Sequence, residues 1–217
     1  MYLSVDSAIN FVRTHLDEIV STAPDMLGSG ELDDRNLETT VSRLMEEAIV
    51  YVHLQCLPEL LEGISIPSGS SPEAVVEGEV LDIDFSEKDI KFLRLVSFKE
   101  SSSKVLITSA VHEDSTSGKL QQNKYLRGTD KDPILVYQRD SKDLKPHYKY
   151  YTTKQAEPSF SMLYFPYPEL DSNNGYFISA KLMSATLNHL MGLVAQSYYL
   201  NEQANLYFAK VKEEITI

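Results

Sequence analysis

The stretch SAKLMSATLNHLMGLVAQSYYLNEQANLYFAKVKEE, residues 179–214, has the composition of one long helix and decides how the chain must fold. Its apolar side chains are spread around the whole circumference of that helix, not along one stripe. They are Leu182, Met183, Ala185, Leu187, Leu190, Met191, Leu193, Val194, Tyr198, Tyr199, Leu200, Leu206, Tyr207, Phe208 and Val211. A helix that is apolar all round must be enclosed on several sides. We therefore expect one long closing helix within residues 178–217, with its cover completed by neighbouring subunits.

Residues 1–64 are predicted to form a helical hairpin that packs with this closing helix. The apolar side chains of its first helix recur every three or four residues: Val5, Ala8, Ile9, Val12, Leu16 and Ile19. A connector with Pro24 and Gly28 follows, and a second helix has its own apolar face from Leu37 to Val52. Two one-sided helices are not stable alone, so we expect residues 1–64 and 178–217 to share one helical core.

The middle of the chain changes to the pattern of β-structure. Residues 65–72, SIPSGSSP, are a hinge rich in Ser, Pro and Gly. Beyond it, short β-branched and aromatic runs such as FLRLVSF and KVLITSAV alternate with turn signals. The sequence therefore predicts an α+β fold in which residues 73–177 form a central antiparallel β insertion within the helical core.

Charge and composition exclude several classes of protein. The formal net charge is −12, and residues 1–72 alone hold 12 acidic and 3 basic side chains, a net of −9. A sequence-independent nucleic-acid binder needs clustered Lys and Arg, so DNA near the first segment should be repelled. No apolar run approaches the roughly 18 residues of a membrane span, and Asp6 argues against a signal peptide. The single cysteine, Cys56, fits a reducing compartment.

No catalytic or metal-binding motif is present in the sequence. The five histidines are scattered without metal-ligand spacing, and Cys56 is better explained as a small buried side chain than as a nucleophile. The alternating acids between Glu77 and Asp84 fit the solvent face of an edge strand. We therefore expect no enzymatic activity, no metal and no cofactor. An enzyme with a dispersed site remains an alternative, which a cleft holding two strongly perturbed titratable groups would favour.

One polar segment and several tyrosines are candidates for protein contacts. The segment QQNKYLRGTDKDPILVY, residues 121–137, is either a hairpin with a charged tip or a docking element for an acidic partner surface. Nine of the thirteen tyrosines lie at Tyr148 or later, and tyrosine is enriched in protein interfaces. The candidate interface residues are Lys124, Tyr125, Arg127, Tyr164, Tyr167, Tyr198, Tyr199 and Tyr207.

This layout resembles the head-to-tail connector proteins of tailed bacteriophages. The segment NKYLRGTDKDPILVY, residues 123–137, followed by a Tyr/Pro-rich strand and the closing helix, is similar to the ring proteins of crAss-like phages that infect Bacteroides. The resemblance implies a ring, commonly of about twelve copies, stacked beneath the portal protein at one capsid vertex. Such a ring extends the channel for the genome and offers a platform to tail proteins.

From this resemblance we expect a structural virion protein, assembled in the host cytoplasm and located at the capsid–tail junction. Its partners would be copies of itself, the portal protein and other connector or tail proteins, with genomic DNA passing without specific binding and no membrane contact. The acidic side chains expected to face the channel are Asp17, Glu18, Glu38, Glu46 and Glu47. The alternative is a non-enzymatic accessory protein that binds one partner through its tyrosine-rich sheet.

Overall fold

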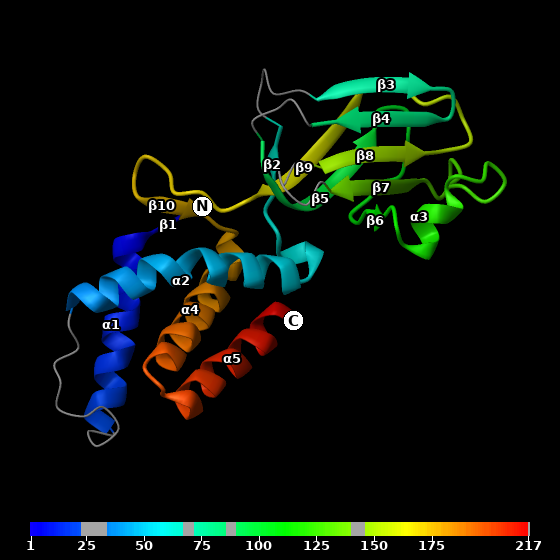
Figure 1. Ribbon diagram of the computed structural model, residues 1–217. Coiled ribbons are helices and arrows are strands. Elements are labelled where there is room, and N and C mark those ends of the chain that lie inside the picture. Colours follow the sequence, from blue (N-terminus) through cyan, green and yellow to red (C-terminus); the bar gives the residue numbers. More distant parts are fainter. Residues whose placement is uncertain (23–33, 67–71, 86–89, 140–145, 217) are drawn as a thin grey trace. The chain divides into compact units, whose positions relative to one another are not determined.

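The computed structural model describes residues 1–22, 34–66, 72–85, 90–139 and 146–216 (Figure 1). The chain is a mixed α+β protein, as the sequence predicts. It divides into two compact units. The helical unit consists of residues 1–62 and 168–217, and the β unit consists of residues 63–167. The predicted connector around Gly28 and most of the predicted hinge lie outside the described residues.

The helical unit contains four α-helices and a small two-stranded sheet in the part that the structure describes. The helices are α1 (Val5–Thr22), α2 (Asp34–Gln55), α4 (Met183–Ser197) and α5 (Asn201–Thr216). Short 3₁₀ turns, η1 (Pro58–Leu60) and η2 (Ala180–Leu182), follow α2 and precede α4. Strand β1 (Tyr2–Ser4) pairs antiparallel with β10 (Gly175–Phe177). The predicted apolar stripe of α1 is buried from Val5 to Leu16.

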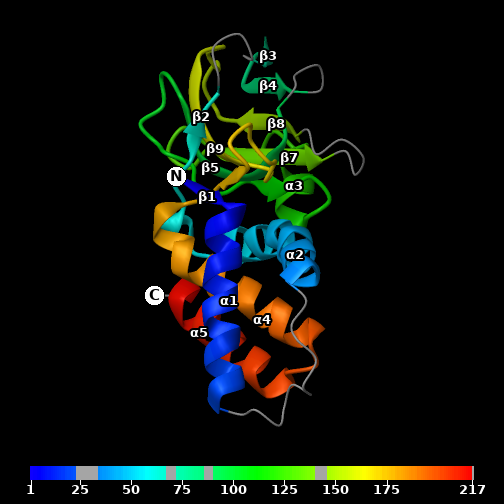
Figure 2. The ribbon, with the colours of Figure 1, turned by 90° about the vertical axis from the view of Figure 1, so that its left-hand side faces the viewer.

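The prediction of one long closing helix is wrong. Helix α4 ends at Ser197, and Tyr199 takes a left-handed backbone conformation with φ of 62°. The Leu200 N–H then donates to the Ala195 carbonyl oxygen at 2.9 Å, which closes the end of α4. The chain reverses there, so α5 returns alongside α4 (Figures 1 and 2).

This reversal explains why the stretch is apolar on every side. Helix α4 packs against α1, α2 and α5, so the cover that we expected from neighbouring subunits comes largely from the same chain. Gly192 lets α5 approach closely, because a Cβ atom there would lie 2.4 Å from the Phe208 ring. Helix α5 buries only one face, through Ala204, Tyr207, Val211 and Ile215.

A buried histidine links α2 to the start of the closing segment. His53 Nδ1 donates to the Ile49 carbonyl oxygen at 2.8 Å, which leaves Nε2 to accept from the Ser179 N–H at 3.1 Å. Ser179 Oγ donates in turn to the Leu60 carbonyl oxygen at 2.6 Å. Burial lowers the pKa of His53 from 6.5 to about 4, so the imidazole is neutral at pH 7. This histidine therefore has a structural role.

The β unit contains two sheets. The five-stranded sheet has the order β3 (Glu73–Glu77), β4 (Val80–Asp84), β8 (Pro146–Tyr151), β7 (Ile134–Arg139) and β6 (Val111–His112). The three-stranded sheet has the order β2 (Ile64–Ser65), β9 (Phe160–Pro166) and β5 (Phe92–Glu100). The predicted antiparallel pairing holds for the described strand pairs except β6–β7, which is parallel. A crossover containing α3 (Thr116–Leu120) makes this parallel pair possible.

The bounds of the β unit differ from the predicted insertion over residues 73–177. The unit begins at Gly63, because β2 pairs with β9. It ends at Tyr167, because β10 pairs with β1 of the helical unit instead of with the other strands. Inward-facing apolar side chains of both sheets form its core, and Tyr148, Tyr150 and Tyr164 belong to that core.

Candidate protein-interaction loop

The crossover between β6 and β7, residues 113–133, contains the segment that the sequence predicts as a docking element. It opens with Ser115, whose side chain caps α3 by accepting the Gly118 N–H at 3.0 Å. Ser115 Oγ also donates to the His112 carbonyl oxygen at 2.5 Å. The start of the crossover is therefore tied to the end of β6.

Gln121 holds the two ends of this loop together from the inside. Its side chain is buried, its Nε2 donates to the Ser117 carbonyl oxygen at 2.9 Å, and its Oε1 accepts the Gly128 N–H at 2.7 Å. Gly128 is required at this place, because a Cβ atom there would lie 2.6 Å from the Ile134 amide nitrogen and 2.8 Å from the Tyr151 carbonyl oxygen. The loop is thus anchored to the sheet on both sides of its tip.

Arg127 fastens the loop to neighbouring strands. Its Nη1 lies 3.6 Å from Glu79 Oε2, and its guanidinium carbon lies 5.6 Å from the centre of the Tyr151 ring. The side chain is largely covered. Arg127 was predicted to engage an acidic partner, but these contacts within the β unit already use its charge and its planar face.

The residues between these anchors form an exposed tip, which we define as Lys119, Leu120, Lys124, Tyr125 and Leu126. Tyr125 is 85% exposed and Leu126 is 55% exposed, although both are large apolar or aromatic side chains. The backbone beneath them is fixed, because Asn123 Oδ1 accepts the Tyr125 N–H at 3.0 Å and the Asn123 carbonyl oxygen accepts the Leu126 N–H at 2.9 Å. Lys124 Nζ lies 5.5 Å from the centre of the Tyr125 ring.

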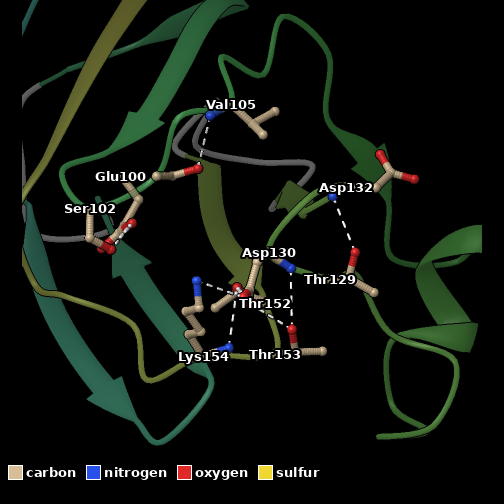
Figure 3. A network of polar contacts seen from close by, with 10 residues as sticks. Glu100, Ser102, Val105, Thr129, Asp130, Asp132, Thr152, Thr153 and Lys154 are labelled. Carbon is tan, nitrogen blue, oxygen red and sulfur yellow. Dashed lines mark hydrogen bonds and ion pairs between the residues drawn. The ribbon is translucent and has the colours of Figure 1, made fainter.

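A polar network surrounds Asp130 in the last part of the loop (Figure 3). Asp130 Oδ1 accepts from Thr153 Oγ1 at 2.6 Å and from Thr152 Oγ1 at 3.2 Å, while Oδ2 lies 2.9 Å from Lys154 Nζ. The Thr153 hydrogen bond, followed by the contact with Lys154, lowers the pKa of Asp130 to about 2. The carboxylate therefore stays charged and joins the loop to the chain that follows β8.

A cavity of about 470 Å³ lies next to this network. Its walls include the buried carboxylate of Glu100, which accepts hydrogen bonds from Ser102 Oγ at 2.8 and 3.0 Å (Figure 3). The same carboxylate accepts the Glu157 N–H at 3.0 Å. Burial raises the pKa of Tyr150, and contact with Asp130 raises that of Lys154. Asp130, Tyr150 and Lys154 therefore keep one protonation state through neutral pH, which does not suit them to proton transfer there.

The structure divides the predicted interface tyrosines into two groups. Tyr164 is 4% exposed and Tyr207 is buried, while Tyr167 and Tyr198 are half-buried. Tyr199 is 89% exposed, at the turn between α4 and α5. Burial removes Tyr164 and most of Tyr207 from the accessible surface. In this set, Tyr125 and Tyr199 are therefore the tyrosines whose rings are exposed and available to a partner.

The five acidic side chains predicted to face a channel lie on α1 and α2. Asp17, Glu18, Glu38 and Glu47 are exposed, and Glu46 is half-buried. Glu38 lies 3.9 Å from Arg13 Nη2, so its charge is partly balanced within the helical unit. The two units differ strongly in net charge. The helical unit has 17 acidic and 6 basic side chains, a net charge of −11, whereas the β unit has 15 acidic and 14 basic side chains, a net charge of −1.

The part of the chain that the structure describes also bears on metal binding and on membrane insertion. There, no group of three or more His, Cys, Asp or Glu side chains is placed to hold a metal ion. None of the described helices combines the length and the apolar character that crossing a membrane requires. The alternating acids belong to the β3–β4 hairpin, where Asp82 contacts His147 and Lys149 on β8. Cys56 is buried.

Neither the known protein-family models nor the curated proteins contain a match to this chain. Its function is therefore inferred from its own residues. The sequence pattern did not single out Gln121, Leu120 or Leu126. The two leucines could have been noticed as isolated apolar residues in a polar segment, but the role of Gln121 depends on a contact across the loop.

Proposed function

We propose that this chain is a structural subunit of an oligomeric ring at the portal vertex of a tailed bacteriophage, where it joins capsid to tail and extends the DNA channel. The observation that carries the proposal is the anchored loop tip with Tyr125 and Leu126 exposed. At the level of residues, the resemblance to connector proteins rests on residues 123–137, which include Lys124, Tyr125 and Leu126 of this tip.

An anchored apolar tip suits a protein that binds other proteins. Removal of exposed tyrosine and leucine side chains from water lowers the free energy, and tyrosine is enriched at the centres of interfaces. A loop that is already fixed loses little conformational freedom when it binds. The hydrogen bonds of Gln121 and Asn123 provide that fixation.

The two units would have different tasks in such a ring. We assign the channel-facing surface to the helical core built from the N-terminal hairpin and the C-terminal helices, and contacts with neighbouring molecules to the inserted β unit. The negative charge of the helical unit would let DNA slide through without adhering, with Asp17, Glu18, Glu38, Glu46 and Glu47 as the channel-facing set. The partners are further copies, the portal protein and tail or connector proteins, and the proposal includes no catalytic step and no cofactor.

The alternative of an accessory protein that binds through a tyrosine-rich sheet has less support. The rings of Tyr148, Tyr150 and Tyr164 lie in the core of the β unit, so they leave little tyrosine surface on the sheets.

Mass measurement and negative-stain imaging test the ring directly. About twelve copies of a 24.5 kDa chain would form a particle of about 290 kDa. The purified chain should form annular particles at high concentration or when its portal protein is added. A chain that remains monomeric, or forms only a one-to-one complex under both conditions, would refute the proposal.

A further inference from the structure

The helical unit has a groove between α1 and α5. Its volume is about 380 Å³. The groove is lined by Ile19, Gln203, Leu206, Tyr207, Ala209, Lys210 and Glu213. Leu206 is 65% exposed, although it is a large apolar residue in the middle of α5. The groove thus combines an apolar floor with room for a side chain from another molecule.

The lining of this groove contains one acidic and one basic side chain, Glu213 and Lys210. A second carboxylate, that of Glu18, lies near Tyr207, and its charge adds to burial in raising the pKa of Tyr207. The basic group at the groove, Lys210, lies with its Nζ 4.8 Å from the centre of the Tyr207 ring. A ligand with a positive charge beside an apolar anchor would therefore fit this surface.

The loop tip has that combination. Residues 116–127 contain three basic side chains and no acidic one. Arg127 is paired with Glu79, and Lys119 and Lys124 are exposed beside Tyr125 and Leu126. A small groove accommodates one projecting aromatic ring better than a flat surface does, and such rings are frequent interface hot spots.

We propose that the loop tip of one copy docks into the α1–α5 groove of a second copy. The Tyr125 ring would lie against Leu206 and Ile19, and Lys124 would face Glu213 and Glu18. This inference rests on the proposed ring function and names the contact that would build the ring. The contact joins two different surfaces, and repetition of such a contact produces a closed ring or a helical filament.

When two copies meet, charge favours the loop tip over a second helical unit as the occupant of the groove. If the helical units of two copies met, two net charges of −11 would face each other. The β unit has a net charge of only −1 and presents basic residues at its loop tip. A contact between unlike units of two copies avoids that repulsion and adds attraction at the rim.

Cysteine cross-linking between two tagged copies tests the contact. One copy carries Tyr125→Cys and the other carries Ala209→Cys, an exposed position that lines the groove. The native Cys56 is buried and remains in both. Mild oxidation should produce a disulfide-linked dimer that carries both tags. In the matched control, Ser42→Cys on the exposed surface of α2 replaces Ala209→Cys, and no cross-linked dimer should form. A tip cysteine that reacts equally with both positions, or only within one chain, would overturn the proposal.

Charge exchange provides a second test that does not depend on oxidation. In sedimentation experiments, Tyr125→Ala should weaken self-association about tenfold or more, and Lys124→Glu should weaken it severalfold. Glu213→Lys should restore the association of Lys124→Glu. The matched control is Lys104→Glu, an exposed lysine elsewhere on the β unit. Circular dichroism should show unchanged folding in each variant.

The outcomes separate this inference from the ring proposal. Rings that form normally with Lys124→Glu and Tyr125→Ala would refute the docking contact and leave the ring intact. Cross-linked dimers or filaments without annular particles, even with the portal protein, would support the contact and refute the ring. Absence of both cross-links and self-association at the highest attainable concentration would refute the contact.

Discussion

Protonation of His53 should make the helical unit unstable in mild acid. The pKa of this imidazole is about 4 in the folded chain, mainly because of burial, and 6.5 in an unfolded chain. The folded pKa is the lower one, so the unfolded state binds more protons and stability falls as pH falls from about 6.5 toward 4. The full difference of 2.5 pKa units corresponds to about 3 kcal/mol, of which about 2 kcal/mol should be lost between pH 7 and pH 5.

Denaturant unfolding at pH 7, 6 and 5 measures this effect, with far-UV circular dichroism reporting the helices. His53→Gln should be less stable than the wild type at pH 7, because it loses part of the hydrogen bonding between Ile49 and Ser179. Its stability should change by about 2 kcal/mol less between pH 7 and pH 5 than that of the wild type. The exposed His112→Gln serves as the matched control.

Burial also lowers the pKa of His189 to about 4. The wild type should therefore lose more stability between pH 7 and pH 5 than His53 alone accounts for. The difference between wild type and His53→Gln isolates the His53 contribution, provided that the two sites act independently. Equal pH dependence in His53→Gln and the wild type would show that this imidazole is not held neutral by burial.

Three further predictions concern packing and the loop. Gly192→Ala should lower the free energy of unfolding by about 1–3 kcal/mol, because the new methyl group meets the Phe208 ring, and Phe208→Leu should recover part of the loss. Gln121→Leu should speed amide hydrogen exchange in residues 116–128 while leaving the strands protected, since it removes the internal clamp. Thr153→Val should raise the pKa of Asp130 from about 2, as followed by carboxyl-carbon NMR, because it removes the hydrogen bond that lowers this pKa most.

Each of these predictions has a result that contradicts it. A Gly192→Ala protein as stable as the wild type would mean that α5 can shift without cost. Uniform acceleration of exchange throughout the β unit in Gln121→Leu would show that this residue supports the sheet and not the loop alone. An unchanged Asp130 titration in Thr153→Val would assign the low pKa to Lys154.

The sequence predicted the parts of the fold in which one residue pattern determines one element. The one-sided apolar pattern from Val5 to Leu16 specifies a helix with one buried face, and α1 has that form. The prediction for the closing segment failed because a helix that is buried by its own chain has the same pattern of apolar residues as a helix that is buried by neighbouring subunits. The reversal at Tyr199 also lacks the usual Gly or Pro signal, since a tyrosine takes the left-handed conformation there.

The candidate site was predictable only in part. Local polarity and turn residues identified the loop around Tyr125, and its exposure agrees with a tip. The inward direction of Arg127 and the burial of Tyr164 depend on strands distant in sequence, so no local pattern reports them. The groove on α5 was missed because Leu206 reads as one more core residue until the helix is seen to bury only its other face.

The helical unit is built from two segments that are far apart in the sequence, residues 1–62 and 168–217, which affects how it folds during translation. Residues 63–167 form one continuous compact unit, so all the strands of that unit are available once residue 167 has been synthesised. Helices α1 and α2 emerge earlier, but the helix that fills their apolar faces is encoded after residue 182. Until α4 has been translated, the faces that α1 and α2 turn toward it have to remain exposed or be covered by a chaperone.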